Sequence, residues 1–118
     1  MPALVTNSKI WGEMFGTKEM HFLFSDESTT QLYLDVEAAQ ARSQSKLNII
    51  PKEAGEKITQ AAKVDIIDWK KLEKRTSIVG YPILPLVEQL SEKVEGNFGQ
   101  FCHWGATTQD IMDTADVL

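Results

Sequence analysis

Residues 101–115, FCHWGATTQDIMDTA, combine side chains that could bind an anion. Thr107 and Thr108 stand where a helix is expected to begin, and a helix N-terminus exposes backbone N–H groups and a partial positive charge. Their hydroxyl groups add two donors, and the side-chain amide of Gln109 adds another. The spacing therefore predicts that a carboxylate or phosphate binds at this helix start without any arginine.

Neighbouring residues favour the same site. Gly105 leaves space for a ligand to approach the backbone closely. His103 could donate to the anion or to a reacting oxygen, because the ordinary pKa of histidine is about 6.5 and its surroundings move it either way. A purely structural interpretation is the alternative. Thr-x-x-Asp, here Thr107 to Asp110, is often only a helix cap, and a histidine beside a tryptophan is usually packed and hydrogen-bonded.

The elements that must position this segment are all expected to be helices. Apolar residues recur three to four positions apart along the chain, and no useful stretch alternates with period two. We expect a long helix over about 26–47, because Ser25 and Asp26 offer N-cap oxygens before it. Its predicted buried face is the run of positions with three-to-four spacing: Leu32, Val36, Ala39, Ser43 and Leu47. Shorter helices are expected to start near Pro51, after Asp65 with an end around Gly80, at Tyr81-Pro82 and at Thr107. The predicted fold class is therefore all-α.

The two ends of the chain differ from this helical middle. Residues 1–24 read as an irregular arm that is too apolar to be a solvated tail, so we expect it to pack on something. The last helix has an apolar stripe and no C-terminal stop signal, which suggests a longer protein cut inside a helix. We therefore expect an N-terminal helical domain with an extended arm over 1–106, and the start of a longer helix over 107–118.

Composition excludes several classes of partner and site. The 118 residues are 42% hydrophobic and 25% charged, which leaves room for one modest core. A formal charge of -5 without a basic run argues against a nucleic-acid or anionic membrane partner. No apolar stretch approaches the ~20 residues that span a bilayer. No metal-ligand spacing or phosphate-binding glycine loop is present, so we expect no metal and no cofactor.

Cys102 and His21 are weaker candidates for chemistry. A single cysteine excludes an internal disulfide, and we expect a reducing cytoplasm. Cys102 has no base nearby in the sequence and is expected to be a small buried hydrophobic residue. His21 lies in the apolar arm without an acidic or cysteine partner, and we assign it no role.

The segment HWGATTQDIMDTA resembles the first signature region of the fumarase/aspartase superfamily, in the branch that contains adenylosuccinate lyase and 3-carboxy-cis,cis-muconate cycloisomerase. Members of this branch show a His-x-Gly-x-Thr-Ser/Thr-x-Asp run at this place. The segments MFGTKEMHFLFSDES, YLDVEAAQARSQSKLNIIPKEA and VGYPILPLVEQL follow the order of the N-terminal domain of these enzymes. The resemblance thus covers nearly the whole chain from about residue 14.

This resemblance implies a lyase or cycloisomerase that acts on a small polycarboxylate and assembles as a homotetramer. In such enzymes a base removes a proton α to a carboxylate, and the resulting enediolate-like anion is held until a leaving group departs. The implied substrate-binding residues are Thr107, Thr108, Gln109 and His103, with Gly105 and Asp110 as supporting residues. The family's catalytic histidine and serine belong to later regions, so the resemblance implies no catalytic residue here and an inactive fragment.

Two departures from the adenylosuccinate lyase pattern favour the cycloisomerase. Met14-Phe15 stands where adenylosuccinate lyases commonly carry an Arg-Tyr pair that grips a nucleotide phosphate. Tyr81-Pro82 stands in place of a His-Asp pair, and the run GYPILPLV resembles the cycloisomerase. We therefore expect a muconate-cycloisomerase-like enzyme. A fumarate-releasing lyase of the adenylosuccinate lyase type, and a non-catalytic helical module that binds an anion or a partner helix, are the alternatives.

Overall fold

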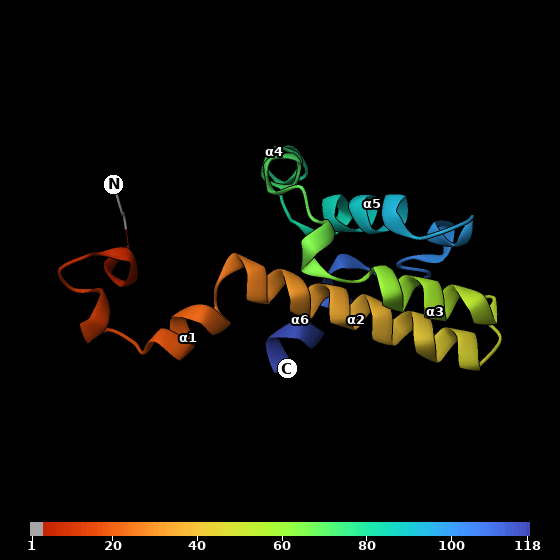
Figure 1. Cartoon of the computed structure of the whole chain (residues 1–118), viewed down its shortest axis with the longest axis horizontal. Helices are drawn as coiled ribbons and strands as arrows, with labels where there is room; N and C mark the ends of the chain where they lie inside the picture. The colour runs from red at the N-terminus through yellow and green to blue at the C-terminus, as the bar shows by residue number, and fades with distance from the viewer. Residues whose placement is uncertain (1–3) are drawn as a thin grey trace.

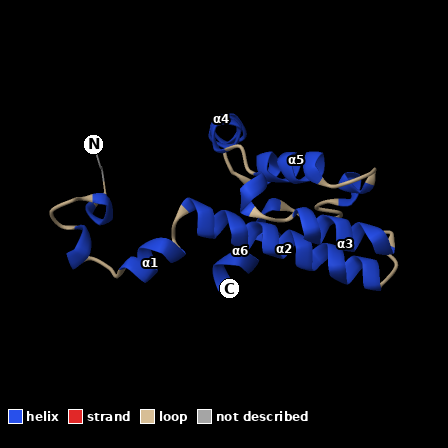
Figure 2. Ribbon diagram, viewed as in Figure 1, coloured by secondary structure: helices blue, strands red, loops and turns tan. Residues whose placement is uncertain are grey.

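The computed structural model describes residues 4–118, and all regular elements in this part of the chain are helical (Figure 2). The α-helices are α1 (Lys18–Leu23), α2 (Asp26–Lys46), α3 (Lys52–Ala61), α4 (Trp69–Val79), α5 (Ile83–Lys93) and α6 (Thr108–Val117). The 3-10 turns are η1 (Val5–Asn7), η2 (Gly12–Met14), η3 (Val64–Ile66) and η4 (Phe98–Phe101). The all-α prediction is confirmed. None of these helices is both long and apolar enough to cross a membrane.

Helix α2 is the longest element, and α3 runs back along it (Figure 1). The start of α2 is fixed by Ser25, whose Oγ accepts the Ser28 N–H at 3.2 Å, as the sequence predicts. The two helices approach closely because Gly55 on α3 has no side chain. A Cβ at this position would overlap the side chain of Ser45 on α2. Glycine is therefore required where these helices meet.

Two groups of buried apolar side chains form the core. The larger lies between α2, α3, α4, α5 and the loop before α6, and its most buried members are Leu34, Ala54, Ile58, Leu86 and Leu90. The smaller group contains Val36, Ile83, Ile111 and Ala115, and it attaches α6 to α2 and α5. Burial of Ile111 and Ala115 therefore holds the start of α6, at Thr107, against α2.

The buried face of α2 differs from the predicted stripe. The sequence favoured Leu32, Val36, Ala39, Ser43 and Leu47, but Ala39, Ser43 and Leu47 are exposed. The buried residues are Thr30, Leu34, Val36, Glu37, Ala38, Ala41 and Ser45. Small residues on this face allow α3 to lie close, and a second face of α2 is covered by α6, so no single apolar stripe marks the contact.

Two predicted helices begin later than expected. The helix after Asp65 is divided into η3 and α4, because Asp68 acts as the N-cap of α4 and accepts the Lys71 N–H at 3.1 Å. It ends at Gly80, whose φ of 97° is the left-handed conformation that glycine adopts without strain. Pro82 is the N-cap residue of α5 and precedes its first turn.

The arm is more regular than predicted and extends away from the helical body (Figure 1). It contains α1, whose N-cap Thr17 accepts the Met20 N–H at 3.2 Å. Residues 1–3 of the predicted arm lie outside the described residues. The large apolar side chains of the arm are exposed: Ile10, Trp11, Met14, Phe15, Phe22 and Phe24. The packing partner that the sequence led us to expect is not found within the described part of this chain.

Gln89 connects α5 to the start of α4, and its loss should destabilise the fold. Its side chain is 4% exposed, accepts the Asp68 N–H at 2.8 Å and donates to the Asp68 carbonyl oxygen at 3.2 Å. We expect Gln89→Met to lower the free energy of unfolding by about 2 kcal/mol, because the Asp68 N–H loses its acceptor and the Asp68 carbonyl oxygen keeps only the Leu72 N–H. Urea unfolding measures this. The matched control Gln100→Met removes an exposed amide and should change stability by less than about 0.5 kcal/mol; equal effects would contradict the assignment.

Candidate functional site

Three side chains on α2 bind the loop that precedes α6. The side-chain amides of Gln40 and Gln44 both donate to the Trp104 carbonyl oxygen, at 3.0 and 2.7 Å. One turn earlier, Oε1 of Glu37 lies 2.6 Å from Nδ1 of His103. Positions separated by three and four residues lie on one helix face, so a rigid helix fixes the loop at two successive residues.

His103 and Glu37 form a partly buried pair. The Glu37 side chain is 0% exposed, whereas the His103 side chain is 21% exposed. The hydrogen bond from the ring to Glu37 raises the pKa of His103, burial opposes this, and the charges of Glu37 and Asp110 raise it further. The net shift favours the protonated imidazolium. Glu37 therefore accepts from Nδ1–H, and Nε2 is left for other contacts.

The raised pKa of His103 should make the stability of the fold depend on pH. The folded protein binds this proton more tightly than the unfolded chain does. The pair therefore stabilises the fold fully below the ordinary histidine pKa and loses that contribution as the pH rises through the raised value. We expect the free energy of unfolding to fall as the pH rises above the ordinary histidine pKa, and His103→Gln to lack this part of the fall. Urea unfolding across this range measures it; identical slopes would contradict the pair.

The two threonines lie at the start of α6, where the sequence places them. Thr107 is the N-cap residue and is exposed, and Thr108 is the first helical residue and is half-buried. The hydroxyl of Thr108 has no hydrogen-bond partner among the described residues. The backbone N–H groups of Thr108 and Gln109 also have no acceptor there. Unpaired donors at a helix start are suited to bind an anionic ligand.

Two donors of the predicted anion site are already engaged. The Asp110 carboxylate accepts the Thr107 N–H at 2.9 Å, as in a capping box. Its negative charge therefore lies at the helix N-terminus and offsets the positive end of the helix dipole. The Gln109 side-chain amide donates to Asp113. The helix start thus supplies less positive potential than its sequence suggests.

A small hollow lies beside this helix start. Its volume is about 250 Å³, and its lining residues are Val36, Gln40, Gly105, Ala106, Asp110, Ile111 and Thr114. Gly105 has a φ of 73°, and a Cβ there would meet nothing within 4 Å. The backbone of the loop is therefore open to close approach. The other predicted residues, Thr107, Thr108, Gln109 and His103, lie next to this hollow in sequence but do not line it.

Cys102 and His21 do not extend the site. Burial raises the pKa of the Cys102 thiol to about 11, which leaves it unreactive near neutral pH. His21 lies against Gly16 in the arm, and its Nε2 is buried without a hydrogen-bond partner among the described residues. Within residues 4–118, no group of three His, Cys, Asp or Glu side chains is arranged to bind a metal ion.

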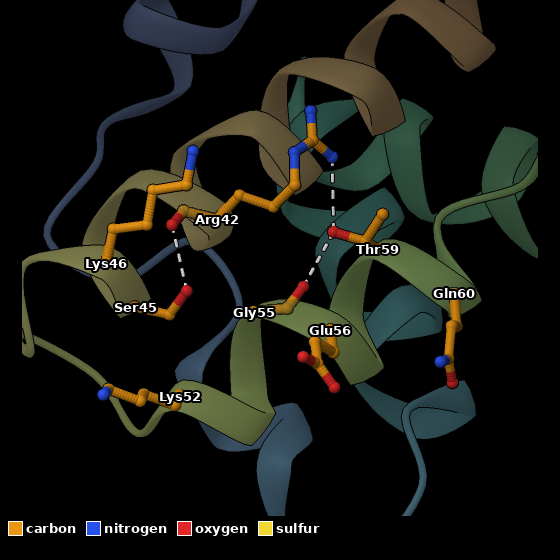
Figure 3. Close-up of a pocket in the computed structure, with 8 residues that line it drawn as sticks. All are labelled: Arg42, Ser45, Lys46, Lys52, Gly55, Glu56, Thr59 and Gln60. Atoms are coloured by element: carbon orange, nitrogen blue, oxygen red, sulfur yellow. Dashed lines mark hydrogen bonds between the residues drawn. The ribbon is translucent and has the colours of Figure 1, made fainter.

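A larger hollow between α2 and α3 carries basic side chains but no converging donors (Figure 3). Arg42 donates to Thr59 Oγ1 at 3.2 Å, and Thr59 donates in turn to the Gly55 carbonyl oxygen at 2.7 Å. Lys46 and Lys52 extend away from each other in Figure 3, and Glu56 adds a negative charge. The side chains of this hollow bind one another or extend into solvent and do not converge on a ligand position. The loop before α6 is therefore the better candidate site.

Comparisons with known proteins show to which superfamily the chain is related. No family model matches the chain. The chain is 50% identical in sequence to the crystal structure of a fumarate lyase from Mesorhizobium sp., with a TM-score of 0.81 over 87% of this chain and 24% of that one. It matches the structure of β-carboxy-cis,cis-muconate cycloisomerase from Acinetobacter calcoaceticus with 32% identity and a TM-score of 0.87, over 92% and 26% of the two chains. The chain is homologous to members of the fumarase/aspartase superfamily.

A third relative matches this chain over its whole length. The chain is 42% identical to trans-aconitate decarboxylase 1 of Mycosarcoma maydis over 118 residues, which is 100% of this chain and 24% of the relative. The chain thus spans about a quarter of the length of the curated relatives it matches. These relatives include lyases and a cycloisomerase, so the predicted superfamily is confirmed.

Glu37, Gln40 and Gln44 are the site residues that the sequence analysis missed. They lie 60 to 66 positions before the residues that they bind, so local spacing does not connect them to the loop. One signal was present. Glu37 lies next to Val36 and Ala38 in the run YLDVEAAQ, and a carboxylate on the buried side of a helix requires a partner.

Proposed function

We propose that this chain is part of a lyase or cycloisomerase that catalyses addition–elimination next to a carboxylate of a small polycarboxylate, most like 3-carboxy-cis,cis-muconate cycloisomerase. The observation that carries the proposal is the pair at the start of α6, exposed Thr107 and half-buried Thr108, directly after a loop fixed by α2. Their hydroxyls and the free N–H groups of the first turn are suited to bind a carboxylate.

The names of two relatives suggest a narrower substrate class. Trans-aconitate and 3-carboxy-cis,cis-muconate each carry three carboxylates around carbon–carbon double bonds. Chemistry at such a molecule develops negative charge on a carboxylate next to the reacting carbon. Fixed donors aimed at that carboxylate stabilise the developing charge, typically by a few kcal/mol for each donor. We therefore propose an unsaturated polycarboxylate as the substrate.

We further propose that these residues supply a substrate-binding part of the site and no catalytic base or acid. The support is that the matched relatives are about four times as long as this chain. The base and acid would come from the remainder of a longer protein, in a homo-oligomeric assembly, and the 118 residues alone would be inactive. A cytoplasmic location and the absence of a metal or cofactor stay predictions.

An assay of the full-length natural protein tests the proposal. Trans-aconitate and 3-carboxy-cis,cis-muconate are offered as substrates, and loss of their ultraviolet absorbance follows the reaction. We expect turnover of at least one of them by the full-length protein and none by the 118-residue chain. Failure with both, while other unsaturated polycarboxylates also stay unchanged, would contradict the proposed class.

A fumarate-releasing lyase is the second candidate, because the fumarate lyase structure is 50% identical to this chain. The same carboxylate site would then bind a succinyl group whose proton and leaving group depart to give fumarate. Release of fumarate from succinyl adducts of amines and thiols distinguishes this candidate from the first one.

A further inference from the structure

Glu37 is a buried carboxylate with an incomplete set of partners. Its side chain is 0% exposed, and its Oε2 has no hydrogen-bond donor in the described part of the chain. Burial of a carboxylate costs several kcal/mol unless a cation or several donors compensate it. The partner that contacts it is the ring of His103, at 2.6 Å. The pair therefore has a strong electrostatic reason to be an imidazolium and a carboxylate.

The surrounding sequence leaves His103 as the source of positive charge. Residues 94–118 contain no lysine or arginine, and neither do residues 31–41 of α2, the stretch that contains Glu37 and Gln40. Asp110 adds a negative charge at the helix start. An anion bound at Thr107 and Thr108 would thus meet acidic neighbours. A protonated His103 compensates them, since its nearest charged groups are Glu37 on α2 and Asp110 on α6.

The backbone of His103 indicates that its side chain is needed there. Its φ is 59°, a left-handed conformation that costs a residue with a Cβ about 1 kcal/mol or more. Glycine would avoid this cost. The ring is fixed from one side by Glu37, and the loop backbone is fixed by the Trp104 carbonyl contacts to α2. The contacts of the backbone and of the side chain therefore hold the imidazole in one orientation.

We propose that Glu37 is a positioning residue that keeps His103 protonated and oriented, so that Nε2–H donates to the anionic group of the substrate. This inference rests on the proposed function, because it adds a charged donor to the same carboxylate site. Glu37 itself does not touch the substrate. Its charge is buried behind the ring, and the cationic edge of the pair is the accessible one.

Glu37→Gln in the full-length natural protein tests the inference. Glutamine keeps an acceptor for Nδ1–H and removes the charge, so His103 should be neutral near pH 7. We expect the KM for the polycarboxylate to rise about 10- to 100-fold with a much smaller change in kcat, because a hydrogen bond from a charged donor becomes a neutral one. The matched control is Glu27→Gln, an exposed carboxylate on the same helix, which should leave KM unchanged.

Two further readouts separate positioning from a structural defect. At a pH below the ordinary histidine pKa, the ring protonates without help from Glu37, so the KM of Glu37→Gln should return toward that of the natural protein. In ¹⁵N-histidine spectra near pH 7, both ring nitrogens of His103 should be protonated in the natural protein, and the charge should be lost in the variant. His21 serves as the internal reference in these spectra.

The possible outcomes decide the inference separately from the proposed function. An unchanged KM in Glu37→Gln, or a raised KM that low pH does not restore, overturns the inference. If Glu37→Gln does not fold, the natural protein decides: a neutral His103 ring near pH 7 overturns the inference, and a protonated one supports it. If the natural protein turns over no polycarboxylate, the proposed function fails, and the nitrogen spectra alone decide whether Glu37 sets the charge of His103.

Discussion

Thr108→Ala in the full-length protein should lower kcat/KM for its polycarboxylate about 100-fold while the free energy of unfolding changes by less than about 1 kcal/mol. Thr108 is half-buried at the first residue of α6, and its hydroxyl makes no hydrogen bond within residues 4–118. The hydroxyl is therefore available to a ligand, and the fold does not depend on it. Steady-state kinetics and urea unfolding measure the two quantities.

Two other threonines provide the comparison for this result. Thr59→Ala removes a hydroxyl that contacts Arg42 and Gly55 away from the loop, and it should leave kcat/KM unchanged. Thr107→Ala should reduce both activity and stability, the latter by about 1 kcal/mol, because Thr107 is also the N-cap of α6. Full turnover by Thr108→Ala would show that the threonines only begin a helix.

Gly99→Ala should destabilise the fold by about 3 kcal/mol or more, the largest single-residue loss that we expect around the site. A Cβ on Gly99 would overlap the backbone carbonyl oxygen of Ser91 on α5. That backbone cannot move without displacing α5, so η4 would have to shift away from it. The loop that carries His103 begins directly after η4, and activity should fall together with stability. Thermal or urea unfolding measures the loss.

Gly96→Ala is the matched control for this steric effect. Gly96 has a φ of 68°, so alanine there is strained, but its Cβ would meet Phe98 only at an ordinary contact distance of 3.6 Å. We expect a loss of about 1 kcal/mol. If Gly96→Ala were as destabilising as Gly99→Ala, backbone conformation and not the overlap with Ser91 would explain the effect.

The helices were largely predictable because their signals are local. The caps at Ser25 and Thr107 and the stop at Gly80 each depend on residues within a few positions, and the structure places them as expected. The short α1 was missed, since six residues carry too little periodicity to separate a helix from an irregular arm. The predicted apolar stripe of α2 was wrong, because α3 and α6 cover two different faces of that helix.

The candidate site was predictable only in part. The run of Thr107, Thr108 and Gln109 follows from the start of one helix, and their role in binding stays a prediction. The partner of His103 depends on a contact across 66 positions, which no local pattern reveals. The engagement of the Thr107 N–H by Asp110 follows from the capping box, but its effect on the positive end of the helix requires the geometry.

The loop's attachment to α2 has a consequence for the kinds of change that this part of the molecule accepts. Glu37, Gln40 and Gln44 face the loop because they share one phase of a helix with 3.6 residues in each turn. Inserting or deleting one residue between Glu37 and Gln40 would rotate the two by about 100° relative to each other. His103 and the Trp104 carbonyl could then no longer be bound together. The length of α2 across these two turns is therefore more constrained than its composition.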